Sequence, residues 1–155
     1  MSNIYSIGEL VPKAGFRMRN HNAETKQVII SDASTANINP GNGMKIVGDA
    51  DGKVIVDKIT ALTDVLYCVV EGSLNRDFPY NQSTATENNP VITGIKKDEV
   101  YLTAGVALAA GAKFQFNATG DKIVALTTGT NAGTVLQASL ADEDVIKTSL
   151  NISNV

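Results

Sequence analysis

The stretch "GAKFQFNATGDKIV", residues 111–124, decides the fold because the chain already contains a similar stretch, "GMKIVGDADGKVIV", at residues 43–56. Shifted by 68 positions, the two stretches are identical at six of 14 places. Each places two short apolar runs on either side of a turn that contains glycine. In the earlier stretch, the pair Asp51-Gly52 tolerates the positive φ that tight turns require. Both stretches therefore predict a β-hairpin.

The similarity continues beyond the hairpins. "VLYC" at residues 65–68 aligns with "VLQA" at residues 135–138, at an offset of 70. Two interpretations remain open: an internal duplication of one β unit, over about 43–74 and 111–140, or two hairpins that converged on the same turn chemistry. Either interpretation predicts a mainly β protein, a small β-barrel or β-sandwich built from hairpins.

The rest of the chain also alternates with a period of two. Further strands are expected at residues 26–31, 99–103, 113–116, 121–126, 134–139 and 145–152. In the last of these, Ile146, Thr148, Leu150 and Ile152 share one face. "VLYCVV" at residues 65–70 is a continuous apolar run and predicts a central buried strand. Helical patterning is weak: residues 57–65 could hold one short helix, although two threonines disfavour it.

The chain divides into an arm and a domain. Residues 1–25 lack clean periodicity and predict an extended N-terminal arm with one short strand near residues 16–18. Residues 26–155 form the predicted β-rich domain, interrupted by a long polar surface loop at about 75–90. A chain of 155 residues buries about 70% of its unfolded surface, so it needs no disulfide or metal. One barrel and two small lobes are both compatible with this length.

The overall charge argues against several kinds of partner. The formal net charge is −3, the isoelectric point is near 5.1, and the Lys and Arg residues are scattered. Because no basic cluster could neutralise phosphates, we expect no direct nucleic-acid partner. The N-terminus has no signal-peptide pattern and the apolar runs are too short to span a bilayer. We therefore expect a protein made in a cytoplasm with no membrane partner.

Residues that could carry chemistry are few. His21, the single histidine, lies in a polar, Asn-rich stretch and is interpreted as an exposed loop residue. The lone Cys68 lies in an apolar run and is interpreted as a buried thiol. "DADG" at residues 49–52 resembles the start of a calcium loop but lacks the later ligands, and its counterpart at 117–120 lacks both carboxylates. The sequence predicts no enzyme, no catalytic residue, no cofactor and no metal site.

Two longer stretches resemble a known family. They are "LTAGVALAAGAKFQFNATGDKIVAL" (102–126) and "GTVLQASLADEDVIKTSLN" (133–151), and "VIVDKITALTDVLYCVVEGS" (54–73) has the same layout. The order of turns and strands resembles the capsid decoration, or cement, proteins of tailed bacteriophages. The resemblance implies a structural virion protein. It would bind the outer surface of a phage capsid and stabilise contacts between subunits of the major capsid protein.

The resemblance also implies a partner, and the sequence itself suggests contact residues outside the stretches that carry the resemblance. The major capsid protein is the expected partner, and the protein is expected to form a homo-oligomer on the capsid, either a dimer or a trimer. The expected contact residues are Ile4, Tyr5, Ile7, Leu10 and Val11 in the arm, and Phe78 and Tyr80 in the long loop. The arm residues are apolar in a segment with little local structure to bury them. The alternative is that they pack on the barrel's own core.

Two other functions remain open at this stage. One is a β-barrel or β-sandwich binding module for glycans or host surfaces, such as a head fibre or a tail tip. An aromatic content of 5% argues against it, because sugars commonly stack on aromatic rings. The other is a small hydrolase or lyase that uses His21.

Overall fold

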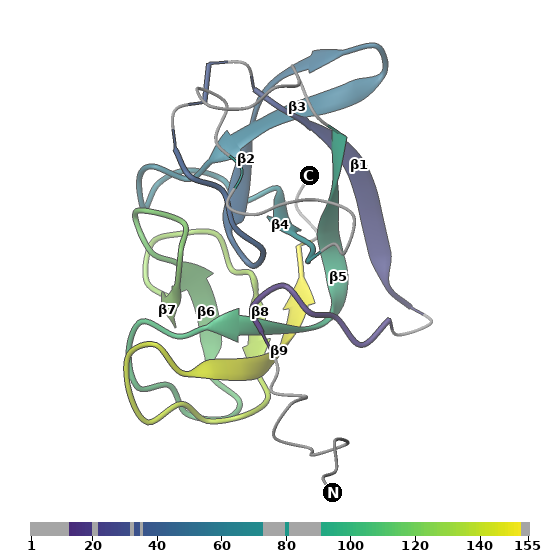
Figure 1. The fold of residues 1–155 in the computed structure, drawn as a ribbon. Coiled ribbons are helices and arrows are strands. Elements are labelled where there is room, and N and C mark those ends of the chain that lie inside the picture. The colour runs from purple at the N-terminus through teal and green to yellow at the C-terminus, as the bar shows by residue number, and fades with distance from the viewer. Residues whose placement is uncertain are drawn as a thin grey trace, which may run out of the picture.

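In the computed structural model, residues 13–19, 22–31, 33–34, 36–72, 80 and 91–152 are described. These residues form nine strands and contain no helix (Figure 1). The strands are β1 (Glu24–Ile30), β2 (Gly43–Ala50), β3 (Lys53–Lys58), β4 (Cys68–Val70), β5 (Val91–Thr103), β6 (Lys113–Phe116), β7 (Ile123–Ala125), β8 (Gly133–Val135) and β9 (Val145–Asn151). The prediction of a mainly β fold is confirmed.

The strand order explains how the chain closes into barrels. Along the sheet the order is β1-β3-β2-β4-β5-β9-β8-β6-β7, with an additional pairing of β1 with β5. β1 pairs parallel with β3 and antiparallel with β5, so the first five strands close into a ring. The last four strands close a second ring with the C-terminal half of β5, where Ala104 forms a parallel bridge with Ile123 on β7.

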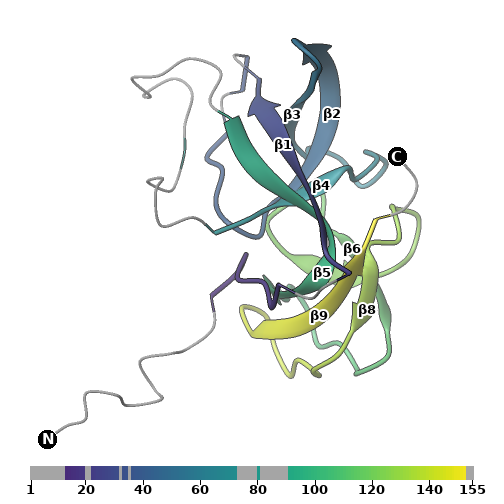
Figure 2. The ribbon, with the colours of Figure 1, turned by 90° about the vertical axis from the view of Figure 1, so that its right-hand side faces the viewer.

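The two rings are two small barrels that share one strand. β5 has 13 residues, and it bends from the upper group of strands in Figure 1 into the lower group, which Figure 2 shows from the side. Its residues before Lys97 pair with β1 and β4, and its residues from Lys97 onward pair with β9. The sequence left open whether the repeated units form one barrel or two lobes. The structure contains two barrels, which are fused through β5.

Both barrels repeat one internal arrangement. In the first, β2 lies between β3 and β4; in the second, β6 lies between β7 and β8. The pair Gly48–Ile55 in the first hairpin corresponds to Phe116–Ile123 in the second, at the offset of 68. The repeat also reaches further than residues 43–74 and 111–140, because β1 and the second half of β5 occupy corresponding positions in the two rings.

The hairpin turns differ in length. Asp51 and Gly52 have φ values of 53° and 76°, which is the geometry of a two-residue turn between right-twisted strands. In the second hairpin the side chain of Asn117 accepts a hydrogen bond from the backbone N–H of Asp121 at 3.1 Å. This side chain closes a longer turn, so β6 and β7 end sooner than β2 and β3.

Two further predictions concern residues 57–70, between β3 and the end of β4. The central strand at 65–70 is confirmed in position, between β2 and β5, but is shortened to β4. The short helix considered at 57–65 is wrong. There, the carboxylate of Asp64 accepts hydrogen bonds from the backbone N–H groups of Thr60 at 2.8 Å and Ala61 at 2.9 Å. This closes a turn instead of a helix.

The core consists of two apolar clusters, one for each barrel. One cluster fills the first barrel and includes Val28, Met44 and Val56. A larger cluster fills the second barrel, and Ile59 and Leu66 of the first unit belong to it. The predicted inward face of β9 is confirmed, because Ile146, Thr148, Leu150 and Ile152 are all buried. Shared apolar packing therefore joins the barrels into one body.

Residues 13–19 form a strap along β5. Arg17 forms an antiparallel β-bridge with Val100. The N–H of Met18 donates to the carbonyl oxygen of Glu99 at 2.9 Å, and the N–H of Tyr101 donates to the carbonyl oxygen of Phe16 at 2.8 Å. The short strand predicted near residues 16–18 is therefore confirmed as a bridge. Residues 1–12 of the predicted arm, and most of the loop at 75–90, lie outside the described residues.

Candidate functional site

Most of the predicted contact residues cannot be placed. Ile4, Tyr5, Ile7, Leu10, Val11 and Phe78 lie outside the described residues, as does His21. Tyr80 is described: it forms a bridge with Ile38 through two backbone hydrogen bonds of 2.8 Å and is only 5% exposed. Its ring belongs to the core of the first barrel. A contact of Tyr80 with a partner stays a prediction, and a partner would not meet an exposed ring there.

A buried ionic cluster fastens the strap, and the sequence analysis did not identify it. The guanidinium of Arg17 pairs with Glu71, which follows β4, and with Asp98 on β5 at 3.2 Å. Asp98 also accepts hydrogen bonds from the backbone N–H groups of Arg19 at 3.1 Å and Glu99 at 2.7 Å, and its side chain is fully buried. The signal in the sequence was the alternation of Phe16, Arg17 and Met18, which indicates that the arginine lies on the opposite face of the strap from its two apolar neighbours.

The two apolar neighbours of Arg17 lie on the solvent side of the strap. Phe16 and Met18 are each about half exposed, while Arg17 between them is largely buried. The strap therefore enters the described structure with an apolar outer face and a charged inner face. Phe16 and Met18 of the strap are therefore apolar side chains that a partner can reach.

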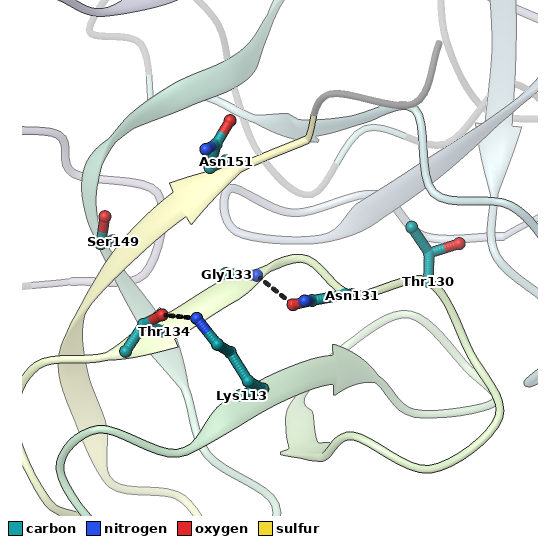
Figure 3. Close-up of a pocket in the computed structure, with 7 residues that line it drawn as sticks. All are labelled: Lys113, Thr130, Asn131, Gly133, Thr134, Ser149 and Asn151. Carbon is teal, nitrogen blue, oxygen red and sulfur yellow. Dashed lines mark hydrogen bonds between the residues drawn. The ribbon is translucent and has the colours of Figure 1, made fainter.

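A polar depression lies on the outer face of the second barrel (Figure 3). It has a volume of about 380 Å³ and is lined by Lys113, Thr130, Asn131, Gly133, Thr134, Ser149 and Asn151. The ammonium of Lys113 donates to the hydroxyl of Thr134 at 2.9 Å, and the side-chain oxygen of Asn131 accepts from the N–H of Gly133 at 3.1 Å. Amide and hydroxyl groups of this kind can hydrogen-bond a polar ligand.

A second depression, of about 560 Å³, lies between the barrels and contains several ion pairs. Lys58 on β3 pairs with Asp121 of the second hairpin turn, which links the barrels across the depression. Lys122 pairs with Glu143 and with Asp142, the latter at 2.9 Å. Hydrogen bonds to these two carboxylates raise the pKa of Lys122 above its usual value.

Cys68 and Lys96 are ionisable groups in the interior of the first barrel. The ammonium of Lys96 lies 3.8 Å from the centre of the Tyr67 ring, and burial lowers the pKa of this lysine. Cys68 is fully buried, and its burial raises the pKa of the thiol to about 12. The interpretation of Cys68 as a buried thiol is confirmed.

The raised pKa of Cys68 predicts a protected thiol. At pH 8 we expect the folded protein to resist Ellman's reagent, and the unfolded protein to release one equivalent of thiolate. The thiol ionises near pH 9 in the unfolded chain and near pH 12 in the folded chain. The stability linked to the protonated thiol of Cys68 is therefore fully present below pH 9 and is lost as the pH rises to about 12. The variant Cys68→Ala, which should not label at all, serves as the control. Fast labelling of the folded wild type would contradict the burial.

The described residues contain no group of three or more His, Cys, Asp or Glu side chains that could hold a metal ion. Over the same residues, no helix has the length and apolar character needed to cross a membrane.

The geometry defines a class of fold: a mainly β protein in which two small barrels share one long strand. No protein-family model and no curated protein matches the sequence. Among solved structures, the chain is similar to the N base of head fiber gp8.5 in bacteriophage phi29, at 9% sequence identity and a TM-score of 0.47. The match covers 86% of this chain and 98% of that chain. A likeness at this level assigns neither a family nor a function.

Proposed function

We propose that this protein is a structural component of a tailed-phage virion that binds the outer surface of the capsid and stabilises contacts between major capsid protein subunits. The observation that carries the proposal is the extent of the family resemblance. The two stretches that resemble capsid decoration proteins, 102–126 and 133–151, span the end of β5 and all of β6 to β9. The resemblance therefore covers four of the five strands of one barrel and the end of the fifth, instead of scattered fragments.

The shape of the molecule suits this role. Two barrels that share β5, with Ile59 and Leu66 of the first unit packed into the core of the second, give a two-part body that can bridge neighbouring subunits. The strap leads the chain out along β5, so residues 1–12 can reach about 40 Å when extended. An arm of this kind can add a strand to a neighbour's sheet edge and gain backbone hydrogen bonds without large apolar area. A dimer or a trimer on the shell would repeat these contacts.

The test is binding to shells assembled from the major capsid protein encoded in the same genome. We expect the full chain to co-sediment with expanded shells, and to raise the temperature at which they disrupt. Deletion of residues 2–12 should leave the fold intact, as judged by circular dichroism, and weaken binding. Unchanged binding of the truncated chain would remove the arm from the interface, and no binding of the full chain would refute the proposed function.

A glycan- or host-binding module of a head fibre or tail tip is the second candidate. The polar depression in Figure 3 favours it, since hydroxyl and amide side chains such as Thr134 and Asn151 can hydrogen-bond sugar hydroxyls. Imaging of virions separates the candidates. Density spread evenly over the shell supports capsid stabilisation. Density confined to fibres or to the tail, together with a signal on a glycan array, supports attachment.

A further inference from the structure

One end of the second barrel is an exposed apolar surface. It consists of residues 106–110, between β5 and β6, and residues 136–141, between β8 and β9; we call these two segments the apolar end. Leu108 and Ser139 form an antiparallel bridge between them, so the segments lie side by side, at the lower end of Figure 1. Val106, Leu136 and Leu140 are exposed, and so are the alanines of both segments.

The two segments themselves contain no charged residue. Neither residues 104–112 nor residues 132–141 contain a lysine, arginine, histidine, aspartate or glutamate. Lone exposed apolar residues are common on protein surfaces, but contiguous apolar patches generally mark interaction sites. The composition of the apolar end therefore requires an explanation.

The first barrel provides an internal comparison. Its turn at residues 39–42 reads Asn-Pro-Gly-Asn, and the corresponding turn at residues 109–112 reads Ala-Ala-Gly-Ala. Both turns make the same hydrogen bonds. The N–H of Gly41 donates to the carbonyl oxygen of Val70 on β4, and that of Gly111 to Val135 on β8, both at 2.8 Å, and each turn closes on itself at 3.1 Å. The fold thus accepts polar residues in this turn. The alanines of the second barrel are not required by the backbone.

Leu140 is the most prominent residue of the apolar end. It is 88% exposed, yet its backbone is fixed, because the carboxylate of Asp144 accepts hydrogen bonds from its N–H at 2.9 Å and from that of Ala141 at 3.1 Å. The neighbouring Ser139 is held by Leu108 and by the carbonyl oxygen of Val106 at 2.8 Å. A large apolar side chain on a fixed backbone loses little entropy on binding, which favours its use as a contact.

The charges beside Leu140 select the partner. Asp142 and Glu143 are exposed, and Lys122 pairs with both, so two carboxylates face one lysine. A second copy that docked through the same region would bring acidic groups towards each other, which disfavours a symmetric dimer here. A partner with an apolar centre and basic residues around it is complementary.

The strap links this surface to the proposed capsid interface. Ala14 lines the depression between the barrels together with Thr103, Lys122 and Glu143. The described chain therefore begins beside the acidic residues that border the apolar end. One partner can contact the N-terminal arm and the apolar end at the same time.

We propose that the apolar end docks on the major capsid protein, on an apolar patch whose border is basic, with Leu140 as the central contact and Asp142 and Glu143 facing the basic residues. This inference rests on the proposed function and adds the surface that carries it.

The experiment measures the affinity of the full chain for shells assembled from the same genome's major capsid protein. The variant Leu140→Lys should bind about tenfold more weakly or worse, because the substitution removes a central apolar contact and places a charge in the interface. Leu140→Met, which keeps the apolar volume, and Val47→Lys, an exposed position on β2 of the first barrel, should stay within about twofold of wild type. Each variant should keep the wild-type circular dichroism spectrum, since the altered side chains are exposed.

A second arm tests the charges. The double variant Asp142→Asn with Glu143→Gln should bind severalfold more weakly at low salt, and the difference should vanish at about 0.5 M salt, where surface charges are screened. The matched control is Asp49→Asn, an exposed aspartate on the first hairpin.

The possible outcomes separate the inference from the proposed function. If wild type binds shells and Leu140→Lys binds equally well, or if Val47→Lys is equally impaired, the inference is wrong and the proposed function stands. If wild type does not bind, both are wrong. If sedimentation velocity shows a wild-type dimer that Leu140→Lys abolishes, the occupant is a second copy, which also overturns the inference.

Discussion

Replacing Gly133 with alanine is expected to cost about 3 kcal/mol or more in the free energy of unfolding, because a steric clash adds to backbone strain. Gly133 begins β8, where it pairs with Leu150 on β9, and its φ is 148°. A Cβ atom at this position would lie 2.0 Å from the carbonyl oxygen of Ser149. The backbone of β9 cannot withdraw without losing its pairing with β5, so the second barrel would open.

Gly111→Ala is the matched control for this clash. Gly111 also has a positive φ, of 91°, but a Cβ atom there would meet nothing within 4 Å. Its replacement should cost only the strain of a left-handed residue, about 1–2 kcal/mol. Urea unfolding followed by circular dichroism gives both values. Equal losses in the two variants would show that strain alone, and not the approach of Ser149, sets the requirement for glycine.

Replacing Asp98 with alanine is expected to cost about 3 kcal/mol, since it breaks a largely buried ion pair and leaves two backbone N–H groups without their acceptor. Arg17 would keep only Glu71, and the N–H groups of Arg19 and Glu99 would lose their acceptor. The strap should then separate from β5. Hydrogen exchange should become faster at the amides of Gly15 and Met18, which donate to the carbonyl oxygens of Tyr101 and Glu99.

A double-mutant cycle distinguishes the ion pair from general damage. Arg17→Ala combined with Asp98→Ala should cost less than the sum of the single changes, because the pair is lost only once. Asp49→Ala, at an exposed position of the first hairpin, should change stability by less than about 0.5 kcal/mol. Additive losses, or unchanged exchange at Gly15 and Met18, would mean that the strap is held by other contacts.

Local pattern was sufficient to predict much of the fold. The alternation in β9, the pair Asp51-Gly52 and the apolar run that contains β4 each specify a structure within a few residues. The similarity of 43–56 and 111–124 further predicted that one arrangement occurs twice. All of these signals depend on neighbours in the sequence, which is why they can be read without the structure.

Features set by distant contacts left no such signal. The first half of β5 was not predicted, because Gly94 and Lys96 interrupt its apolar alternation. Gly94 is needed where Cys68 crosses, since a Cβ there would lie 2.6 Å from the sulfur, and Lys96 lies over Tyr67. The parallel pairing of β1 with β3 likewise joins segments 26 positions apart, Val28 with Val54, and closes the first barrel.

The candidate contact surfaces also differ in whether local sequence reveals them. The arm residues stand out as apolar side chains in an unpatterned segment, whereas Tyr80 stands in a polar stretch and is buried by a distant pairing with Ile38. The apolar end was missed because five of its eleven residues are alanines, which do not produce a strong hydrophobic pattern. It became visible only when the fold placed its two segments together and gave a polar counterpart for comparison.

The sharing of β5 has a consequence for how the molecule comes apart. A strand that belongs to one barrel can detach while the other barrel persists, but β5 cannot leave either ring without breaking both. The two barrels should therefore unfold in a single cooperative transition, in spite of their separate cores. Heat or force that separates β5 from its neighbours is then opposed by both barrels at once.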